Sequence, residues 1–496
     1  MNLLPLLIII PLLGAIIVLL MRSCAKPWHD AVTFITLIAL SVIAVLVQTG
    51  VVSHGMMVFN PGSVVPGLGT IAVADGLTGL MLITINTVIT CMVIFSIDYI
   101  NRFEDSALYY FLILMTTAGL NGVLISGDLF TLYVFMEIAV ISAYVLTAFT
   151  NEPESLEASF KYAVIGGVSS LLILCAIAFI YAETGSLSFH EIAIAWNRPE
   201  HFLTVLVMVL LIVGFGIKST LIPFSSWVPD AYTAAPAPVA GIFSGAVSKV
   251  VGIYALMRLL YNIFGFDAHI MSVVGWLAVA SIIIGVTLAL YQWNFKRLLA
   301  YHSISQIGYM ILGLSLGTPL GIAGGLMHLI NHSVFKPLLF LNAGSIEHTS
   351  NATTLKDMGG LAQRMPVTGA TSLIASLSIS GIPPFNGFWS KLLIIFACVQ
   401  SGKFGFAVIA VAGSILTLAS FTKVQRYAFM GPLNRAAQSI GEATMLMRLS
   451  MIILTVLCVS MGVLLLPGVY EVFLEPAVRA LTVGRHYGVA IEKLLQ

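Results

Sequence analysis

Charged side chains are scarce in this chain of 496 residues: Asp, Glu, Lys and Arg make up 9% of it, against about 25% in an ordinary soluble domain. Hydrophobic residues account for 59%, and the mean hydropathy is +1.03. Because a water-exposed surface needs more charge than this, the composition predicts an all-α polytopic membrane protein. The formal net charge of +1 gives no sign of a nucleic-acid partner, and none is expected.

Cofactor-binding motifs are missing as well. The five cysteines are scattered and form no Cys-x-x-Cys pair, which argues against an iron–sulfur or zinc framework. No Gly-rich phosphate loop or dinucleotide fingerprint occurs in a strand–helix context. We therefore expect no cofactor, no metal and no catalytic residue in this chain, and expect the thiols to act as small buried apolar groups.

Long apolar runs, by contrast, fill the sequence. Cutting it at polar and Pro/Gly breaks predicts about 14 transmembrane helices of roughly 20 residues each. The predicted spans are 2–21, 30–50, 73–98, 108–126, 129–149, 158–181, 203–225, 237–260, 270–291, 297–315, 319–345, 367–400, 405–428 and 447–469. We expect a single integral membrane domain over 1–496. Its predicted parts are helices 1–3 in 1–105, a first repeat in 108–260, a second repeat in 268–428, and helix 14 with a short amphipathic tail in 429–496.

Lysines and arginines in the connections predict the orientation, since cytoplasmic loops are enriched in both. With the N-terminus outside, the inner side holds Arg22, Lys26, Arg102, Lys161, Lys296, Arg297, Lys356, Arg364, Lys423, Arg426, Arg435 and Arg448. The outer side holds Arg198, Arg258, Lys403, Arg479, Arg485 and Lys493. This excess predicts a plasma-membrane protein with both termini on the external or periplasmic side.

Two predicted helices, the seventh and the twelfth, contain prolines in their interior. Pro223 interrupts the seventh, and Pro383 with Pro384 interrupts the twelfth. Proline removes an amide donor, and a break at membrane depth is tolerated only against protein or a water-filled cavity. Each break has a lysine nearby, Lys218 or Lys391. A pair of interrupted helices in corresponding positions predicts two inverted five-helix repeats, helices 4–8 and helices 9–13.

Five charged residues lie within apolar runs: Glu137, Lys218, Lys249, Lys336 and Lys391. One charge at the bilayer centre costs about 3 kcal/mol, so five cost on the order of 15 kcal/mol before any pairing. Such residues mark an ion or proton pathway by default. We expect Glu137 to pair with Lys218, because each favours the charged form of the other. The alternative is a purely structural pair.

The remaining lysines have different alternatives. Lys249 is poorly placed to reach the membrane interface, since the nearest predicted helix end is about 11 residues, or roughly 16 Å, away. Lys391 is expected at the outer exit of the pathway, with an interfacial anchor as the alternative. Lys336 ranks lowest, because it stands beside Pro337 near the predicted helix end. His302, near the start of the tenth helix, is a candidate for the inner access point.

The eleventh predicted helix carries His328, His332 and Lys336 at positions i, i+4 and i+8, on one face. Histidine changes charge near neutral pH, so this face suits a proton relay. A zinc site is the first alternative, but no carboxylate joins the two histidines and a lysine ends the face. Hydrogen bonding between helices is the second.

Five segments carry a resemblance to a known family: GDLFTLYVFME at 127–137, KSTLIPFSSWVPD at 218–230, KRLLAYHSISQIG at 296–308, HLINHSVFK at 328–336 and GIPPFNGFWSK at 381–391. The chain resembles the antiporter-like membrane subunits shared by Mrp-type sodium/proton antiporters, respiratory complex I and membrane-bound nickel–iron hydrogenases. The Mrp and hydrogenase branches look most similar. His302 departs from the pattern, since relatives often have serine there.

The resemblance implies a proton-translocating subunit of a multi-subunit complex. Its implied pathway joins the Glu137–Lys218 pair to Lys249, to His328 or His332, and to Lys391. The implied partners are other membrane subunits, including antiporter-like ones, together with lipid and protons; transport of Na⁺ stays open. As an enzyme it would be a pumping subunit of a redox-driven translocase or of an Mrp antiporter. The alternative functions are a stand-alone secondary transporter of a small solute and an inactive scaffold.

Overall fold

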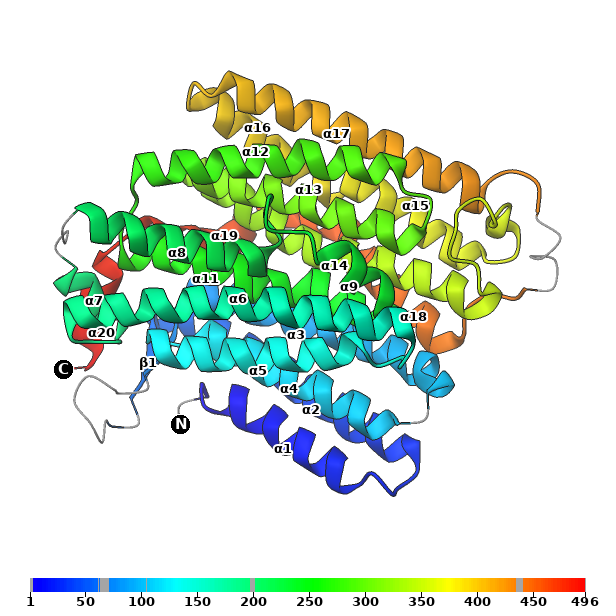
Figure 1. Ribbon diagram of the computed structural model, residues 1–496, viewed down its shortest axis with the longest axis horizontal. Coiled ribbons are helices and arrows are strands. Elements are labelled where there is room, and N and C mark those ends of the chain that lie inside the picture. Colours follow the sequence, from blue (N-terminus) through cyan, green and yellow to red (C-terminus); the bar gives the residue numbers. More distant parts are fainter. Residues whose placement is uncertain are drawn as a thin grey trace.

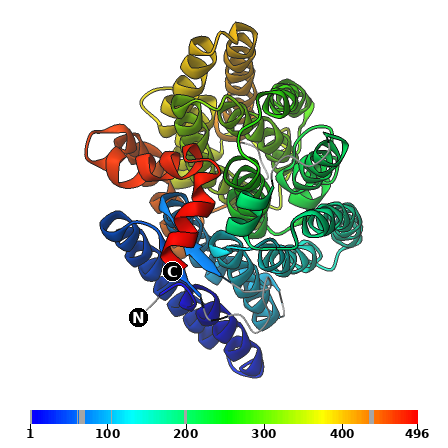
Figure 2. The same cartoon turned by 90° about the vertical axis from the view of Figure 1, so that its left-hand side faces the viewer.

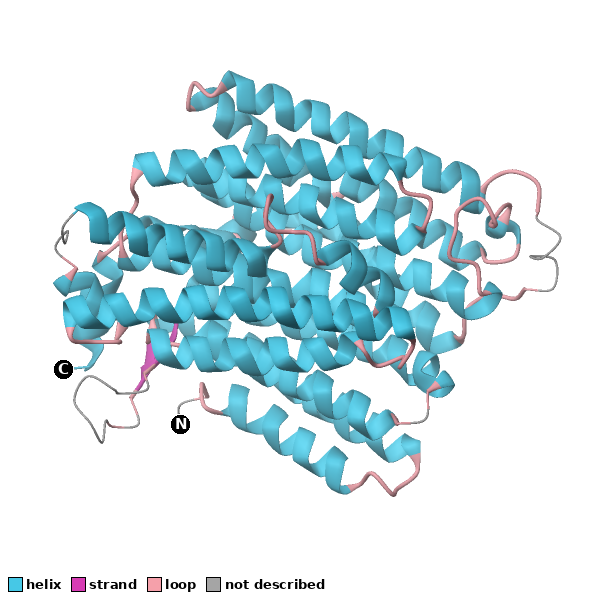
Figure 3. Ribbon diagram, viewed as in Figure 1, coloured by secondary structure: helices cyan, strands magenta, loops and turns pink. Residues whose placement is uncertain are grey.

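The computed structural model describes residues 3–60, 62, 71–103, 105–196, 201–433 and 440–495. Long helices packed side by side make up nearly all of it (Figure 1, Figure 3). The longer ones are α1 (Leu6–Leu20), α2 (Lys26–His54), α3 (Gly76–Tyr99), α4 (Ser106–Ile125), α5 (Leu129–Thr147), α6 (Pro153–Thr184), α8 (His201–Ser219), α12 (Ala268–Tyr291), α13 (Phe295–Ser315), α14 (Pro319–Ser350), α15 (Pro366–Ser380), α16 (Asn386–Gln400), α17 (Phe404–Val424), α18 (Met445–Ser460) and α19 (Val469–Thr482).

Short helical pieces complete the bundle. They are η1 (Ile100–Arg102), α7 (Phe189–Ala195), α9 (Val228–Ala234), α10 (Ala237–Ile242), η2 (Phe243–Tyr254), α11 (Ala255–Met257), η3 (Arg258–Ile263), η4 (Leu361–Gln363), η5 (Gln425–Phe429), η7 (Met461–Leu465) and α20 (His486–Leu495). Every predicted span overlaps one helix or consecutive helical pieces, although the third begins in a strand and the seventh runs past the end of α8 at Ser219. In the described part of the chain, ten helical stretches are long and apolar enough to cross a membrane. The all-α fold class is therefore confirmed, while the number of crossings and the inverted repeats stay predictions.

A short β-hairpin is one feature that the hydropathy pattern did not predict. Strands β1 (Met57–Phe59) and β2 (Ala72–Ala74) pair antiparallel, with Val58 opposite Val73. The third helix consequently starts at Gly76 rather than at residue 73, and the Asp75 carboxylate caps it by accepting from the Thr78 amide. An apolar pattern alone does not distinguish a short strand from the first turn of a helix.

Both predicted helix breaks are present. Helix α8 ends at Ser219, and the next residue, Thr220, has a φ of +68°. Helix α15 ends at Ser380, where Gly381 takes a φ of +80°, and α16 begins at Asn386. The left-handed backbone after each helix stops the hydrogen-bond ladder, and the proline segments that follow cannot continue it.

The segment 237–263 lies at the centre of the bundle, and all of its residues are buried. Two π-helical stretches, η2 and η3, make up most of it. Its glycines allow close packing on both sides. A Cβ on Gly252 would meet the Ser219 backbone at 2.4 Å, and a Cβ on Gly245 would meet the Pro337 ring at 2.5 Å. The central helix is thus held between the end of α8 and the middle of α14.

The chain ends lie at the same end of the bundle (Figure 1). There the C-terminal helices fold back, with α19 against α3 and α14 and α20 against α7. The end view shows these red helices lying over the blue N-terminal part of the chain (Figure 2). Arg258, assigned above to an outer loop, is buried inside the bundle, so that assignment was wrong. Arg198 and Arg435 lie outside the described residues.

The cysteines divide into two groups. Cys91, Cys398 and Cys458 are buried, as expected for small apolar groups, whereas Cys24 and Cys175 are exposed. The expectation that all five act as buried hydrophobes was therefore wrong for two of them. Cys175 lies on α6, several of whose apolar side chains are exposed on the outside of the bundle, and Cys24 lies in the connection between α1 and α2.

Candidate functional site

The predicted Glu137–Lys218 pair forms, and a serine joins its two members. Lys218 Nζ, in the last turn of α8, lies 3.5 Å from Glu137 Oε1 on α5. Ser170 Oγ, on α6, donates to Glu137 Oε1 at 2.6 Å and accepts from Lys218 Nζ at 2.9 Å. The Lys218 side chain is buried, whereas the Glu137 side chain keeps 23% of its surface exposed. One edge of this three-residue group therefore reaches the surface of the chain.

The local structure places Lys218 where a positive charge is favoured. The left-handed Thr220 ends α8 one residue after Ser219, so the lysine lies beside carbonyls that have no intrahelical partner. A cation at a helix C-terminus also interacts favourably with the helix dipole. The break that the prolines predicted thus accounts for the position of the charge.

Lys249 lies within η2 and has no exposed surface. Its Nζ donates to Ser248 Oγ at 3.0 Å. No carboxylate oxygen of the described residues lies within 4 Å of this nitrogen. Its complete burial excludes an ammonium extended to the membrane interface.

The predicted face of the eleventh helix is buried along its whole length. His328, His332 and Lys336 all lie on α14 and have no exposed surface. Within the described structure, the two ring nitrogens of His332 have no hydrogen-bond partner, and the Nζ of Lys336 has none either. The placement of Lys336 near a helix end was wrong, because α14 continues through Pro337 to Ser350. Because α14 extends well beyond Lys336 in both directions, Lys336 is a charge in the interior of the helix.

A second polar cluster surrounds His328 and Lys391. His328 Nδ1 lies 2.9 Å from Ser390 Oγ, and its Nε2 lies 3.2 Å from Gln306 Oε1. Lys391 Nζ, on α16, donates to the Ile379 carbonyl at 2.8 Å, beside the second break. The same ammonium stands 4.6 Å from the centre of the Tyr309 ring, a cation–π distance. Lys391 also lines a cavity of about 220 Å³ with Ser380 and Ser414.

His302 lies away from any water-exposed surface. It has no exposed surface, and its Nε2 is 2.8 Å from Ser420 Oγ on α17. Its Nδ1 has no hydrogen-bond partner among the described residues. The structure therefore places His302 in the interior of the bundle, and its role in inner access stays a prediction.

Charged residues gather at the end of the bundle opposite the termini. Asp230 Oδ1 accepts from Arg297 at 2.9 Å, and its Oδ2 accepts from Lys161 at 3.1 Å. Lys296 Nζ lies 3.2 Å from Glu347 Oε2. These five side chains line a cavity of about 680 Å³. Burial opposes ionisation of Asp230, but Lys161 and Arg297 hold its pKa below the ordinary value.

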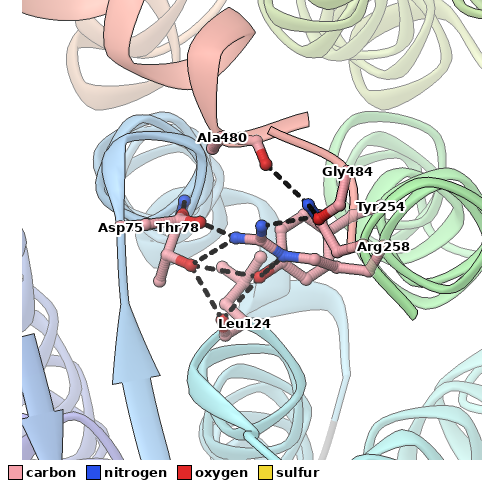
Figure 4. Close-up of polar contacts among 8 residues, drawn as sticks. Asp75, Thr78, Leu124, Tyr254, Arg258, Ala480 and Gly484 are labelled. Carbon is pink, nitrogen blue, oxygen red and sulfur yellow. Dashed lines mark hydrogen bonds and ion pairs between the residues drawn. The ribbon is translucent and has the colours of Figure 1, made fainter. Parts of the chain in front are cut away.

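At the other end, a buried arginine joins three parts of the chain (Figure 4). Arg258 Nη2 donates to Asp75 Oδ1 at 2.5 Å and to Thr78 Oγ1 at 3.1 Å, both at the start of α3. Its Nε donates to the Tyr254 hydroxyl at 3.3 Å, and its Nη1 donates to Asn262 Oδ1 at 3.0 Å. Arg258 was predicted in a loop because it stands near the end of an apolar run.

The uncharged members of the buried clusters were not predicted from the sequence. Ser170, Gln306, Tyr309 and Ser390 all contact a predicted site residue. Ser390 directly precedes Lys391, and Gln306 lies in a segment quoted for the resemblance. Ser170 carried less signal, because serines are common in membrane helices. In the part of the chain described, no three His, Cys, Asp or Glu side chains are grouped as metal ligands.

Comparison with known proteins identifies the family. The model of the NADH:quinone oxidoreductase/Mrp antiporter transmembrane family matches residues 126–417. The chain is 33% identical to a Na(+)/H(+) antiporter subunit of Alkalihalophilus pseudofirmus, over 87% of both chains. It is 34% identical to an NADH-quinone oxidoreductase subunit of Desulforudis audaxviator, over 73% of this chain and 74% of that one.

A solved structure agrees with these matches. A chain of the Mrp complex from Dietzia sp. DQ12-45-1b superposes with a TM-score of 0.91 at 26% identity, covering 98% of both chains. The matched region 126–417 contains Glu137, Lys218, Lys249, Lys336 and Lys391. The resemblance drawn from the five motif segments is thereby confirmed, and the chain belongs to the NADH:quinone oxidoreductase/Mrp antiporter transmembrane family.

Proposed function

We propose that this chain is a proton-translocating membrane subunit of a multi-subunit ion-pumping complex. One observation carries the proposal: Lys249 and Lys336 are fully buried, and neither has a carboxylate partner among the described residues. A buried charge without a counter-ion destabilises the fold unless it can be neutralised or solvated. Release of a proton neutralises a lysine. A buried lysine without a counter-ion is therefore expected in a protein that moves protons, despite the loss of stability.

The order of the groups supports a path along the interior. The Glu137–Ser170–Lys218 group lies at one side of the bundle, next to the central helix that carries Lys249. That helix packs in turn on α14, the helix of His332 and Lys336. His328, farther along α14, reaches Ser390, the neighbour of Lys391. The line then ends beside the cavity at the second helix break.

The proposed mechanism is electrostatic. A change of charge beside Glu137, on its exposed edge, would disturb the contact between this carboxylate and Lys218. The released lysine would change its affinity for a proton, and the next groups, Lys249 and then His332, would respond in turn. Lys391 would exchange the proton at the far end. Whether Na⁺ also moves depends on the parent complex; the relatives include a Na(+)/H(+) antiporter subunit and an NADH-quinone oxidoreductase subunit.

Partners and orientation follow from the same assignment. Other membrane subunits are the expected partners, because the chain superposes on a member of a multi-subunit complex. We place the complex in the plasma membrane, with both termini on the external side. The connections α1–α2, with Arg22, and α14–α15, with Lys356 and Arg364, then face the cytoplasm, at the end of the bundle away from the termini (Figure 1).

Substitution of Lys249 by alanine tests the proposal. In membrane vesicles that contain the whole complex, K249A is expected to abolish coupled proton transport while the complex still assembles. Lys493→Ala is the matched control, since it removes an exposed lysine from α20. Normal transport by an assembled K249A complex would refute the proton pathway. Solute transport by the purified chain alone in liposomes would instead favour a stand-alone transporter.

A further inference from the structure

The helix that carries Lys249 has an uncommon geometry. Residues Phe243–Tyr254 form a π-helix of 12 residues, and Arg258–Ile263 form another of 6 residues. π-Helical hydrogen bonds join residues five apart, and such stretches are rare outside single-turn bulges at functional sites. Since the backbone alone favours the tighter α-helix, contacts with neighbouring helices must hold the wider form.

Close packing holds this helix on both sides, at Gly252 against the Ser219 backbone and at Gly245 against the Pro337 ring. Both contacts lie on the part nearest Lys249. They fix the distance to the neighbouring helices, but a glycine contact does not prevent rotation about the helix axis. The outer end therefore needs a contact of defined direction.

Arg258 supplies that contact (Figure 4). Its guanidinium is anchored to Asp75 Oδ1 and Thr78 Oγ1 on α3, at 2.5 and 3.1 Å. Tyr254 is the last residue of the first π-helix, and its hydroxyl donates to the Leu124 carbonyl on α4 at 2.7 Å. Arg258 Nε donates to the same hydroxyl at 3.3 Å. Two neighbouring helices thus fix the rotation of the outer end.

The pair is suited to a fixed anchor rather than to proton exchange. Burial alone would raise the pKa of Asp75, but the Arg258 guanidinium and hydrogen bonds from Thr78 hold the pKa below its usual value. The guanidinium therefore favours the charged form of the carboxylate that it binds. A planar guanidinium with several directed donors also resists rotation better than an ammonium does.

The C-terminal helices close this site from outside. Asn262 Nδ2, itself held by Arg258, donates to the Ala480 carbonyl at 2.7 Å. The ring of Tyr487, on α20, stacks on the guanidinium, and Arg258 Cζ lies 4.9 Å from the centre of that ring. These contacts cover the ion pair, and Asp75 also lines a cavity of about 420 Å³ together with Arg479 and Tyr487.

We propose that Arg258, held by Asp75 and Tyr254, is a positioning residue that fixes the rotation of the helix carrying Lys249. The inference rests on the proposed function, in which Lys249 is part of the proton path. A slip of one residue in this wider helix would turn Lys249 away from its present neighbours and shift it by about 1 Å along the axis, because the rise per residue is smaller than the roughly 1.5 Å of an α-helix. A misplacement of this size lowers a reaction rate by roughly 100-fold, so we expect a comparable loss of transport without Arg258.

The test compares Arg258→Met, Arg258→Lys and Tyr254→Phe in the whole complex. R258M is expected to slow proton transport about 100-fold, to change the pH dependence of the rate, and to speed amide hydrogen exchange in peptides covering 243–263. Y254F should cause a smaller change in the same direction. R258K should restore part of the rate, because it keeps the charge opposite Asp75.

Arg485→Met is the matched control. Arg485 also fastens the C-terminal helices, through bonds to the Ala193 and Trp196 carbonyls, but the structure gives it no bond to the helix of Lys249. R485M should loosen α20 and leave the pH dependence of transport unchanged. The inference would be overturned if R485M and R258M had equal effects. It would also be overturned if the Y254F and R258M complexes assembled and showed unaltered proton transport and unaltered amide hydrogen exchange. Normal transport by K249A would instead remove the proposed function on which it rests.

Discussion

Removal of the Ser170 hydroxyl is expected to weaken the coupling between Glu137 and Lys218. The hydroxyl bonds to both charged groups, at 2.6 and 2.9 Å, whereas their own closest approach is 3.5 Å. A hydrogen bond to a charged group contributes about 1.5–3 kcal/mol, so Ser170→Ala should lose about 2 kcal/mol of coupling even if the pair draws together. At about 1.36 kcal/mol for each factor of ten, the paired state becomes about 30-fold less populated.

The assay is the initial rate of proton transport in vesicles that contain the assembled complex. S170A should slow transport by about 10- to 30-fold, and Ser170→Thr, which keeps a hydroxyl, should restore most of the rate. Ser169→Ala is the matched control, because Ser169 Oγ bonds to the Gly214 carbonyl at 2.7 Å and also links α6 to α8. If S170A and S169A transport equally well, the serine bridge has no part in coupling.

Two further substitutions separate stability from transport. Lys336→Leu should raise the thermal midpoint of the complex and should impair transport. The reason is that it replaces a buried ammonium, which has no hydrogen-bond partner among the described residues, by an apolar group. Light-scattering or dye-binding melts measure the midpoint, and a lower midpoint would contradict this prediction. Asp230→Asn should lower the free energy of unfolding by about 1 kcal/mol at neutral pH, and by less at high salt. Because Lys161 and Arg297 depress the Asp230 pKa, this contribution should be present above about pH 4 and lost as the pH falls further. Melts of the wild-type and D230N complexes at neutral pH and below about pH 4 would detect the change.

The course of the helices was predictable from the sequence because the membrane leaves few alternatives. Backbone groups in hydrocarbon must bond within the segment, so each apolar run of sufficient length becomes a helix. The breaks after Ser219 and Ser380 were predictable for the same reason, since the prolines that follow prevent continuation. The hairpin β1–β2 was not, because its strands are only three residues long and the second runs into the apolar segment that forms α3.

The site was predicted in part. Charges within apolar runs are conspicuous, and the contact between Glu137 and Lys218 follows from their opposite signs. The partner of Arg258 was not predictable, because Asp75 lies 183 positions away and stands at a helix start where capping explains it equally well. The π-helical form of 243–254 has no composition signature. Lys336 was ranked low because a proline follows it, yet α14 passes through Pro337 without ending.

One end of the proposed line differs from its interior in exposure, and this difference bears on how the chain would be driven. Glu137 retains 23% of its side-chain surface, whereas Lys249 and His332 have none. A neighbouring subunit packed on α5 could therefore change the electrostatic field at Glu137 directly, but it could reach Lys249 only through the Ser170-bridged pair. At the opposite end Lys391 borders a cavity. In the proposed mechanism, a change of charge at the first end acts on the interior groups before it affects Lys391, and the serine-bridged pair would then be the control point of the line.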